Sequence, residues 1–234
     1  MCGHVVPGIL GSPSFGPEEL GMIVAMDGPA GAGKSTVARR VASQLGYSYL
    51  DTGALYRAAA LQARRRGLAF EDTPEMRRMM AEIRIAFDGV RVILDGEDVS
   101  EAIRSPEISH YASVISAIPV VRQMLLPLQR RVGEAQDVVA EGRDMGTVVF
   151  PDAEFKYFLD ATAEERARRR FLELHQKETN TTLEQVLEEM RMRDERDSSR
   201  VAAPLRKAAD AVYILTDGMS VDEIVESIVE RVTT

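Results

Sequence analysis

The chain has 234 residues, 45% of them hydrophobic, and a formal net charge of −8 at pH 7. This length and apolar content can build one substantial core, or a core with a small inserted domain. No apolar run approaches the roughly 20 residues that span a bilayer. The acidic balance argues against a nucleic-acid coat, so we expect neither a membrane span nor a nucleic-acid partner.

Residues 1–21 contain no Lys or Arg and are rich in Gly and Pro, a composition that does not fit a signal peptide. We expect a flexible extension here, with Met22 as an alternative start. The one cysteine of the chain, Cys2, lies in this stretch. A single thiol forms no internal disulfide, so a reducing cytoplasm is the expected location.

The next elements alternate between strand and helix. Short apolar runs predict strands at 23–26 and 47–50. Amphipathic spacing predicts helices at about 34–45 and 54–66, each followed by a glycine that favours helix termination. This β-α-β-α order is typical of a parallel sheet.

The pattern then changes. Two apolar segments, 83–87 and 90–94, flank Asp88-Gly89, which is a strong hairpin signal. We expect short helices from residue 100 to about 131, broken at Pro106, Pro119 and Pro127. A hairpin with helices between parallel units predicts an inserted domain at 67–131.

Parallel-type strands resume after the insert, at 138–141, 155–159 and 211–215. Thr162 to Glu165 reads as a capping box that opens an arginine-rich helix, and a second helix is expected from Thr182 into 193–200. Ser220 to Glu223 caps the terminal helix. The predicted fold class is α/β, with a parallel five-stranded sheet flanked by helices.

One segment after the first strand has a complete phosphate-loop pattern, Gly28-x-x-x-x-Gly33-Lys34-Ser35. Glycines let backbone N–H groups turn around a phosphate, and the helix N-terminus adds about half a positive charge. Lys34 can reach the β- and γ-phosphates and the Ser35 hydroxyl can bind Mg²⁺; the alternative is an accidental glycine-rich turn. The expected ATP-binding residues are Gly28, Pro29, Ala30, Gly31, Ala32, Gly33, Lys34, Ser35 and Thr36.

Two further motifs follow at the carboxyl ends of predicted strands, where open α/β sheets bind ligands. Thr52 and Arg57 suit a second phosphate; the alternative is ordinary helix capping by Asp51 or Thr52. Glu141 can hold the Mg²⁺ water shell, and Arg143 can bridge the donor and acceptor phosphates. The alternative for Glu141 and Arg143 is an ion pair on the surface.

Arginines gather in two later helices. Arg166 and Arg170 stand four residues apart and share a helix face. A solvated charged helix is the alternative for this series, and we assign it to Arg168. The run 193–200, taken alone, is a charged helix face.

Phosphoryl transfer is a reaction that would use all of these motifs. Its transition state needs spread negative charge neutralised by Lys, Arg and Mg²⁺. A nucleoside monophosphate attacks with an oxygen that is already ionised, so no catalytic base is required. The three histidines of the chain therefore need no role.

Five segments together resemble the bacterial-type cytidylate kinase family, and the resemblance runs from Ile23 to the C-terminus. They are 27–36, 51–57, 95–99, 141–152, and 193–200 with Ala203-Pro204-Leu205. The resemblance implies a P-loop kinase core at 22–66 and 132–234, a nucleotide-binding insert at 67–131 and a short lid at about 162–180. It implies ATP and Mg²⁺ as cofactors, CMP and dCMP as substrates, and a monomer.

The same resemblance implies roles for individual residues. Thr52, Arg57 and Arg143 would hold the CMP phosphate, and Ser113, Arg122 and Asp144 would read cytosine. Tyr56 would belong to the substrate site, Arg193 and Asp197 would contact the sugar with Arg200 nearby, and Arg166 and Arg170 would close over the transferring group. The implied catalytic residues are Lys34, Arg57, Arg143, Arg166 and Arg170. Some relatives have Ser in place of Thr52 and Asp in place of Glu141.

Two alternative functions also use a phosphate loop. Shikimate-like or gluconate-like P-loop kinases lack a large insert between Gly67 and Arg131. A GTPase-like switch requires an Asn-Lys-x-Asp element, and the chain contains no Asn-Lys. Phosphorylation of CMP and dCMP is therefore the predicted activity.

Overall fold

The computed structural model describes residues 21–175 and 181–234. The extension expected at 1–21, apart from Gly21, and the end of the expected lid, 176–180, lie outside the described residues.

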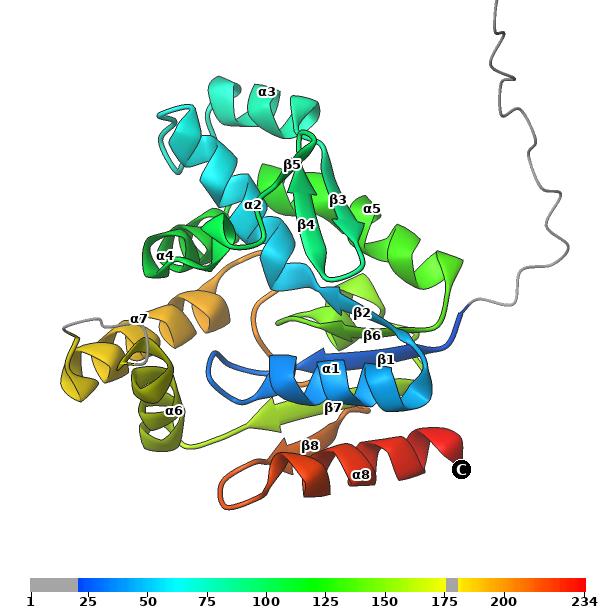
Figure 1. The fold of residues 1–234 in the computed structure, drawn as a ribbon. Coiled ribbons are helices and arrows are strands. Elements are labelled where there is room, and N and C mark those ends of the chain that lie inside the picture. Colours follow the sequence, from blue (N-terminus) through cyan, green and yellow to red (C-terminus); the bar gives the residue numbers. More distant parts are fainter. Residues whose placement is uncertain (1–20, 176–180) are drawn as a thin grey trace, which may run out of the picture.

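Five parallel strands form the central sheet, in the order β2-β6-β1-β7-β8 (Figure 1). The parallel five-stranded sheet confirms the predicted fold class. Four of its strands end on an acidic residue, so the carboxyl edge of the sheet carries several carboxyl groups. The strands are β1 (Ile23–Asp27), β2 (Ser48–Asp51), β6 (Val138–Glu141), β7 (Phe155–Asp160) and β8 (Val212–Leu215).

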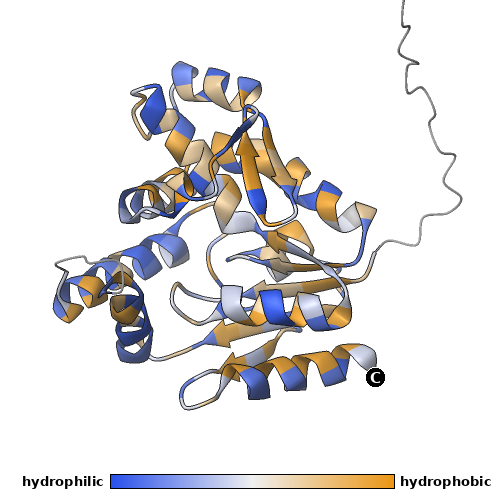
Figure 2. Cartoon of the chain, in the orientation of Figure 1, coloured by the Kyte–Doolittle hydropathy of each residue, from blue (hydrophilic) through white to orange (hydrophobic). Residues whose placement is uncertain are grey.

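Helices cover both faces of this sheet. On one face, α1 (Lys34–Leu45) and α8 (Val221–Thr233) bury an apolar stripe that includes Val37, Val41 and Ile228. On the other face lie α5 (Pro119–Ala135) and the π-helical turn η2 (Met145–Val149). Figure 2 shows the resulting hydrophobic interior along the strands.

The segment predicted as an insert forms a second layer of structure beside the sheet (Figure 1). Its hairpin strands pair antiparallel, as predicted, and a short third strand that the sequence analysis missed extends them. Another missed element is α3 (Pro74–Glu82). The remaining elements here are β3 (Ile85–Asp88), β4 (Arg91–Leu94), β5 (Glu97–Asp98), the 3₁₀ turn η1 (Ala102–Arg104) and α4 (Pro106–Ile115).

A separate apolar cluster holds these elements together, and it includes Leu55, Met76, Leu94 and Ile115. Leu55 belongs to α2 (Thr52–Arg65), which precedes the predicted start of the insert at residue 67. Helix α2 therefore links the two layers: its first residues follow β2 at the sheet edge and its body packs into the second cluster.

The prediction that Pro127 breaks a helix was wrong. Pro106 and Pro119 stand at helix starts, where their missing N–H has no partner to lose. Pro127 instead lies inside α5, which continues through it. Buried neighbours such as Leu125 and Gln129 anchor this helix on both sides of the proline, so packing offsets the lost hydrogen bond.

Two helices, α6 (Ala163–His175) and α7 (Leu183–Ser199), stand at the carboxyl edge of the sheet and share a small apolar cluster around Leu174 and Met190 (Figure 1). The predicted capping box of α6 is only half formed. Thr162 accepts the Glu165 N–H at 3.3 Å, but the Glu165 side chain pairs with arginines, and Asp217 accepts the Thr162 N–H instead. The cap predicted at Ser220 is complete.

No single helix in the described ranges is long and apolar enough to cross a membrane. The bent pair α4 and α5 passes by length and composition only.

Candidate active site

The phosphate loop joins β1 to α1, and three of its glycines have positive φ, a region that favours glycine. Gly33 caps α1 in the left-handed region, with φ of 86°. Gly28 has φ of 145°, and a Cβ there would lie 1.9 Å from the Leu159 carbonyl oxygen. The loop is thus pressed against β7 with its N–H-rich turn at the start of a helix, which is a ready anion site.

Lys34 is buried, and its ammonium donates to the Pro29 carbonyl at 2.6 Å. Burial lowers the pKa of Lys34 well below its usual value, and the charge of Arg143 lowers it further, although Glu141 and Asp27 oppose the shift. The Lys34 side chain therefore lies against the phosphate loop, where the negative charge of a bound phosphate would raise its pKa again.

The start of α2 lies beside this loop. Asp51 caps the helix by accepting the Ala54 N–H at 3.0 Å, so the capping role considered for this segment belongs to Asp51. Thr52 does not cap; its hydroxyl donates to the Glu141 carbonyl at 2.7 Å. Arg57 lies 3.4 Å from the Asp51 carboxylate and lines a cavity that the phosphate loop also borders.

Glu141 ends β6 and is buried, and it accepts a hydrogen bond from the Tyr49 hydroxyl. Burial and the charge of Glu141 raise the pKa of Tyr49. Within the described residues, no group of three or more His, Cys, Asp or Glu side chains could hold a metal alone. One carboxylate with the Ser35 hydroxyl still fits Mg²⁺, which binds nucleotide sites through one or two carboxylates plus phosphate oxygens.

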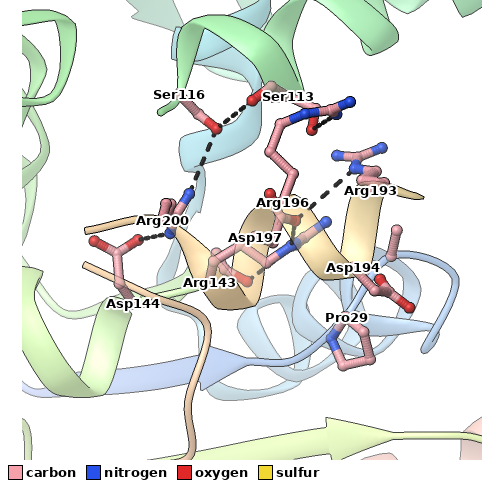
Figure 3. A network of polar contacts seen from close by, with 12 residues as sticks. Pro29, Ser113, Ser116, Arg143, Asp144, Arg193, Asp194, Arg196, Asp197 and Arg200 are labelled. Atoms are coloured by element: carbon pink, nitrogen blue, oxygen red, sulfur yellow. Dashed lines mark hydrogen bonds and ion pairs between the residues drawn. The ribbon is translucent and has the colours of Figure 1, made fainter. Parts of the chain in front are cut away.

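Helix α7 presents a charged face to the cavity, because Arg193, Asp197 and Arg200 recur at helical spacing (Figure 3). Asp197 is buried and accepts from Arg143 Nε at 3.0 Å, and Arg193 Nε lies 4.0 Å from the same oxygen. Desolvation, reinforced by Arg143, Arg57 and Arg170, lowers the pKa of Arg193 to about 9, against the effect of Asp197. Four guanidiniums thus crowd one region, as an anion site requires.

A second charged group lies further along the cavity. Asp144 is buried, forms an ion pair with Arg122 and lies 3.6 Å from Arg200 Nη2. The Arg122 guanidinium also stacks over the Tyr56 ring, 5.4 Å from its centroid. This end of the cavity offers one carboxylate and two cationic donors beside an aromatic face.

Arg196 was not predicted as a site residue, yet its Nη1 donates to the Ser113 hydroxyl at 2.7 Å (Figure 3). This bond joins α7 to α4, and a 3.4 Å bond joins the residues that directly follow these two helices, Arg200 and Ser116. The run 193–200 is therefore a cavity wall and not only a solvated face. The spacing of four and then three residues between Arg193, Asp197 and Arg200 was the available signal.

The arginines of α6 differ in their partners and in whether they line the cavity. Arg170 lines the cavity and is paired with Glu173 at 3.0 Å. Arg166 is buried away from the described cavity lining, and its Nη1 binds Asp194 at 2.6 Å and the Ala30 carbonyl at 3.1 Å. Arg169, which the sequence analysis did not single out, binds Thr216. Arg168 is exposed, as expected of a solvated position, and pairs with Glu165, although both residues also lie at the cavity lining.

These groups share one cavity of about 710 Å³. The phosphate loop from Ala30 to Thr36, the start of α2, the end of β6 and the charged face of α7 all line it. Of the predicted site residues, Gly28, Pro29 and Arg166 are absent from this described lining. The structure thus brings the other predicted residues around one space large enough for two nucleotides' phosphates and a base.

Comparison with known proteins identifies the family. A family model described as cytidylate kinase matches residues 24–234. A cytidylate kinase of Syntrophotalea carbinolica is 53% identical over 215 residues, covering 90% of this chain and 92% of the relative. One of Caldanaerobacter subterraneus is 50% identical over 209 residues, covering 89% and 93%.

Among solved structures, an uncharacterized protein from Eubacterium ventriosum has a TM-score of 0.51 at 12% identity, covering 91% of this chain and 99% of that one, which shows a shared fold alone. The family match spans nearly all of the described residues, including every strand of the sheet and the whole cavity wall. The chain therefore belongs to the cytidylate kinase family.

Proposed function

We propose that this protein transfers the γ-phosphoryl group of ATP to the phosphate of CMP or dCMP, giving CDP or dCDP. Family membership supports the reaction class. The assignment of a nucleotide as the acceptor rests on the layout of the cavity. A phosphate loop lies at one end, the Asp144–Arg122 pair at the other, and several guanidiniums lie between them. A nucleotide acceptor has its phosphate and base separated in the same way.

The acceptor phosphate is assigned to the guanidinium cluster. Thr52, Arg57 and Arg143 would bind its oxygens, with Arg193 beside them at the sugar together with Asp197. Burial, together with the charges of nearby arginines such as Arg143, lowers the pKa of Arg193, and the negative charge of a bound phosphate would offset these effects.

The base is assigned to the other end. Cytosine presents an amino donor at N4 and acceptors at N3 and O2. Asp144 would accept from the amino group while Arg122 donates to the ring acceptors, with Ser113, Tyr56 and Arg200 completing the pocket. The ion pair of Asp144 with Arg122 supports this, since it holds one acceptor and one donor side by side.

The chemistry needs charge neutralisation more than proton transfer. Lys34 would leave the Pro29 carbonyl for the transferring phosphoryl group, and Arg143 would span both phosphates. Arg170 would approach from α6, while Arg166 would hold the loop that binds the donor. When bound through Ser35 and Glu141, Mg²⁺ would add positive charge at the β- and γ-phosphates.

We further propose that 67–131 is the acceptor-binding insert of a core at 22–66 and 132–234, and that about 162–180 is a lid. A monomer in the cytoplasm is the assembly and location that we propose.

An acceptor panel tests the function: ADP production from ATP·Mg²⁺ with CMP, dCMP, UMP, AMP or shikimate. We expect turnover with CMP and dCMP, less with UMP, and little without an acceptor. Preference for shikimate would indicate a small-metabolite kinase, and acceptor-independent ADP release would indicate a nucleotide switch. Either result would refute the proposal.

A further inference from the structure

One buried carboxyl group has no part in the reaction described above. Asp27 is the last residue of β1 and directly precedes Gly28 of the phosphate loop. Its side chain is 3% exposed. Its two oxygens accept the N–H groups of Met145 and Gly146, each at 2.8 Å.

Those two N–H groups start the turn η2, which directly follows Arg143 and Asp144. Within this turn, the carbonyl of Asp144 accepts from Val148 and Val149. The first amides of a helical turn have no partner inside it and need an outside acceptor. Asp27 meets this need from the neighbouring strand, because β1 and β6 pair directly.

The charge on Asp27 is unfavourable to the fold. Burial raises the pKa of Asp27 to about 6, although the Gly146 and Met145 N–H groups oppose the shift. The nearby charges are Asp144, which raises the pKa, and Lys34, which lowers it. A neutral amide of the same size would avoid the buried charge, but it would place an NH2 donor against one of the two N–H groups, which bind different carboxylate oxygens.

We propose that Asp27 is a positioning residue for phosphoryl transfer. It fixes Arg143 and Asp144 relative to the phosphate loop, so that the acceptor and donor sites keep a constant distance and orientation. The geometry supports this because the Asp27 side chain, directly before the loop, binds Met145 and Gly146, the two residues directly after Asp144. The inference rests on the proposed function, since that function gives Arg143 and Asp144 their tasks.

The test replaces Asp27 with asparagine in the full chain and measures kcat, both KM values and ATP binding by calorimetry. Misplacing a reacting group by about 1 Å costs roughly 100-fold, so we expect kcat of Asp27→Asn to fall by about that factor. The KM for CMP should rise about tenfold if the base and phosphate contacts shift together. Affinity for ATP alone should change by less than about threefold, because the phosphate loop is intact.

A matched control lies at the opposite edge of the same two strands, where Asp137 Oδ1 accepts the Met22 N–H at 2.7 Å. Asp137→Asn also removes a carboxylate-to-backbone bond between these strands, but far from Arg143. We expect its kcat to match wild type even if its melting temperature falls.

A folded Asp27→Asn with wild-type kcat and KM for CMP would overturn the inference. So would a loss of ATP affinity as large as the loss of kcat/KM for CMP, because Asp27 would then serve the phosphate loop alone. If this variant does not fold, Asp27→Ser replaces it; failure of both to fold would make Asp27 a stability residue and also overturn the inference. A wild-type protein that forms no CDP would instead refute the proposed function.

Discussion

Replacing Asp144 with asparagine exchanges one carboxylate oxygen for an amide nitrogen at the proposed base end of the cavity. The Asp144 side chain is 4% exposed, it pairs with Arg122, and its Oδ1 lies 3.6 Å from Arg200 Nη2. Cytosine would donate its amino group to Asp144, whereas uracil presents an acceptor, O4, at the same place. With uracil the carboxylate would face a lone pair.

The magnitude follows from this burial. A buried charged group left without its partner costs on the order of 1–3 kcal/mol, or about tenfold to a few hundredfold in kcat/KM. Asp144→Asn should therefore lower kcat/KM for CMP by a factor in this range. The CMP-over-UMP preference should narrow, because the asparagine amide can turn and donate to O4.

The assay compares kcat/KM for CMP and UMP at a temperature well below unfolding. The variant also leaves Arg122 and Arg200 without their anion, so its melting temperature should fall by about 2–4 °C per kcal/mol lost. Asp210→Asn is the control: it removes an ion pair of 2.6 Å with Lys156, outside the described cavity lining. An equal loss on both substrates would refute the reasoning, because Asp144 would then only hold Arg122 and Arg200.

Lys34→Ala should lower turnover by several orders of magnitude with an unchanged circular dichroism spectrum, because the ammonium binds only a loop carbonyl among the described contacts; near wild-type kcat would contradict this. Deleting residues 1–21 should leave activity unchanged and the melting temperature within about 5 °C, the shift expected for roughly 2 kcal/mol in a chain of this size; a larger loss would show that the segment packs. Amide exchange in α6 should slow only when an ATP analogue and CMP are both bound, because Arg170 lines the cavity and needs phosphates to face; identical exchange in all states would count against lid closure. Finally, the pKa of Asp27 is raised from 3.8 to about 6, so the folded state binds this proton more tightly than the unfolded state does. The stabilisation that the bound proton provides is lost as pH rises through about 6. The free energy of unfolding of wild type relative to Asp27→Asn should therefore fall between pH 4 and pH 7, by up to about 3 kcal/mol, and a difference independent of pH in urea titrations would contradict the shift.

The local elements were predictable from the sequence because their causes are local. Helix α1 runs over the predicted residues, 34–45, since its apolar spacing and its terminal Gly46 lie within the segment itself. The parallel strands shifted by only a residue or so for the same reason. The phosphate loop was readable because its glycines and Lys34 are adjacent in the chain, and the family resemblance rested on such contiguous runs.

The same local reasoning failed at Pro127 and at Glu165. Proline was expected to end a helix, but burial of Leu125 and Gln129 on either side keeps α5 continuous. Glu165 was expected to close a capping box, but arginines one turn later compete for its carboxylate. In both cases side-chain partners outweighed a local preference that is worth only about 1–3 kcal/mol.

Residue types and spacing determined the fold class and the phosphate loop, and the family resemblance of contiguous segments implied most of the other site residues. Only the tertiary structure decided how those charges pair. Asp27 meets Met145 across 118 positions of sequence, Arg166 meets Ala30 across 136, and Arg196 meets Ser113 across 83. No periodicity links such distant residues. Their pairing is set by which strands lie side by side in the sheet and how closely α7 approaches α4, and burial then makes each unpaired charge costly enough to select one partner.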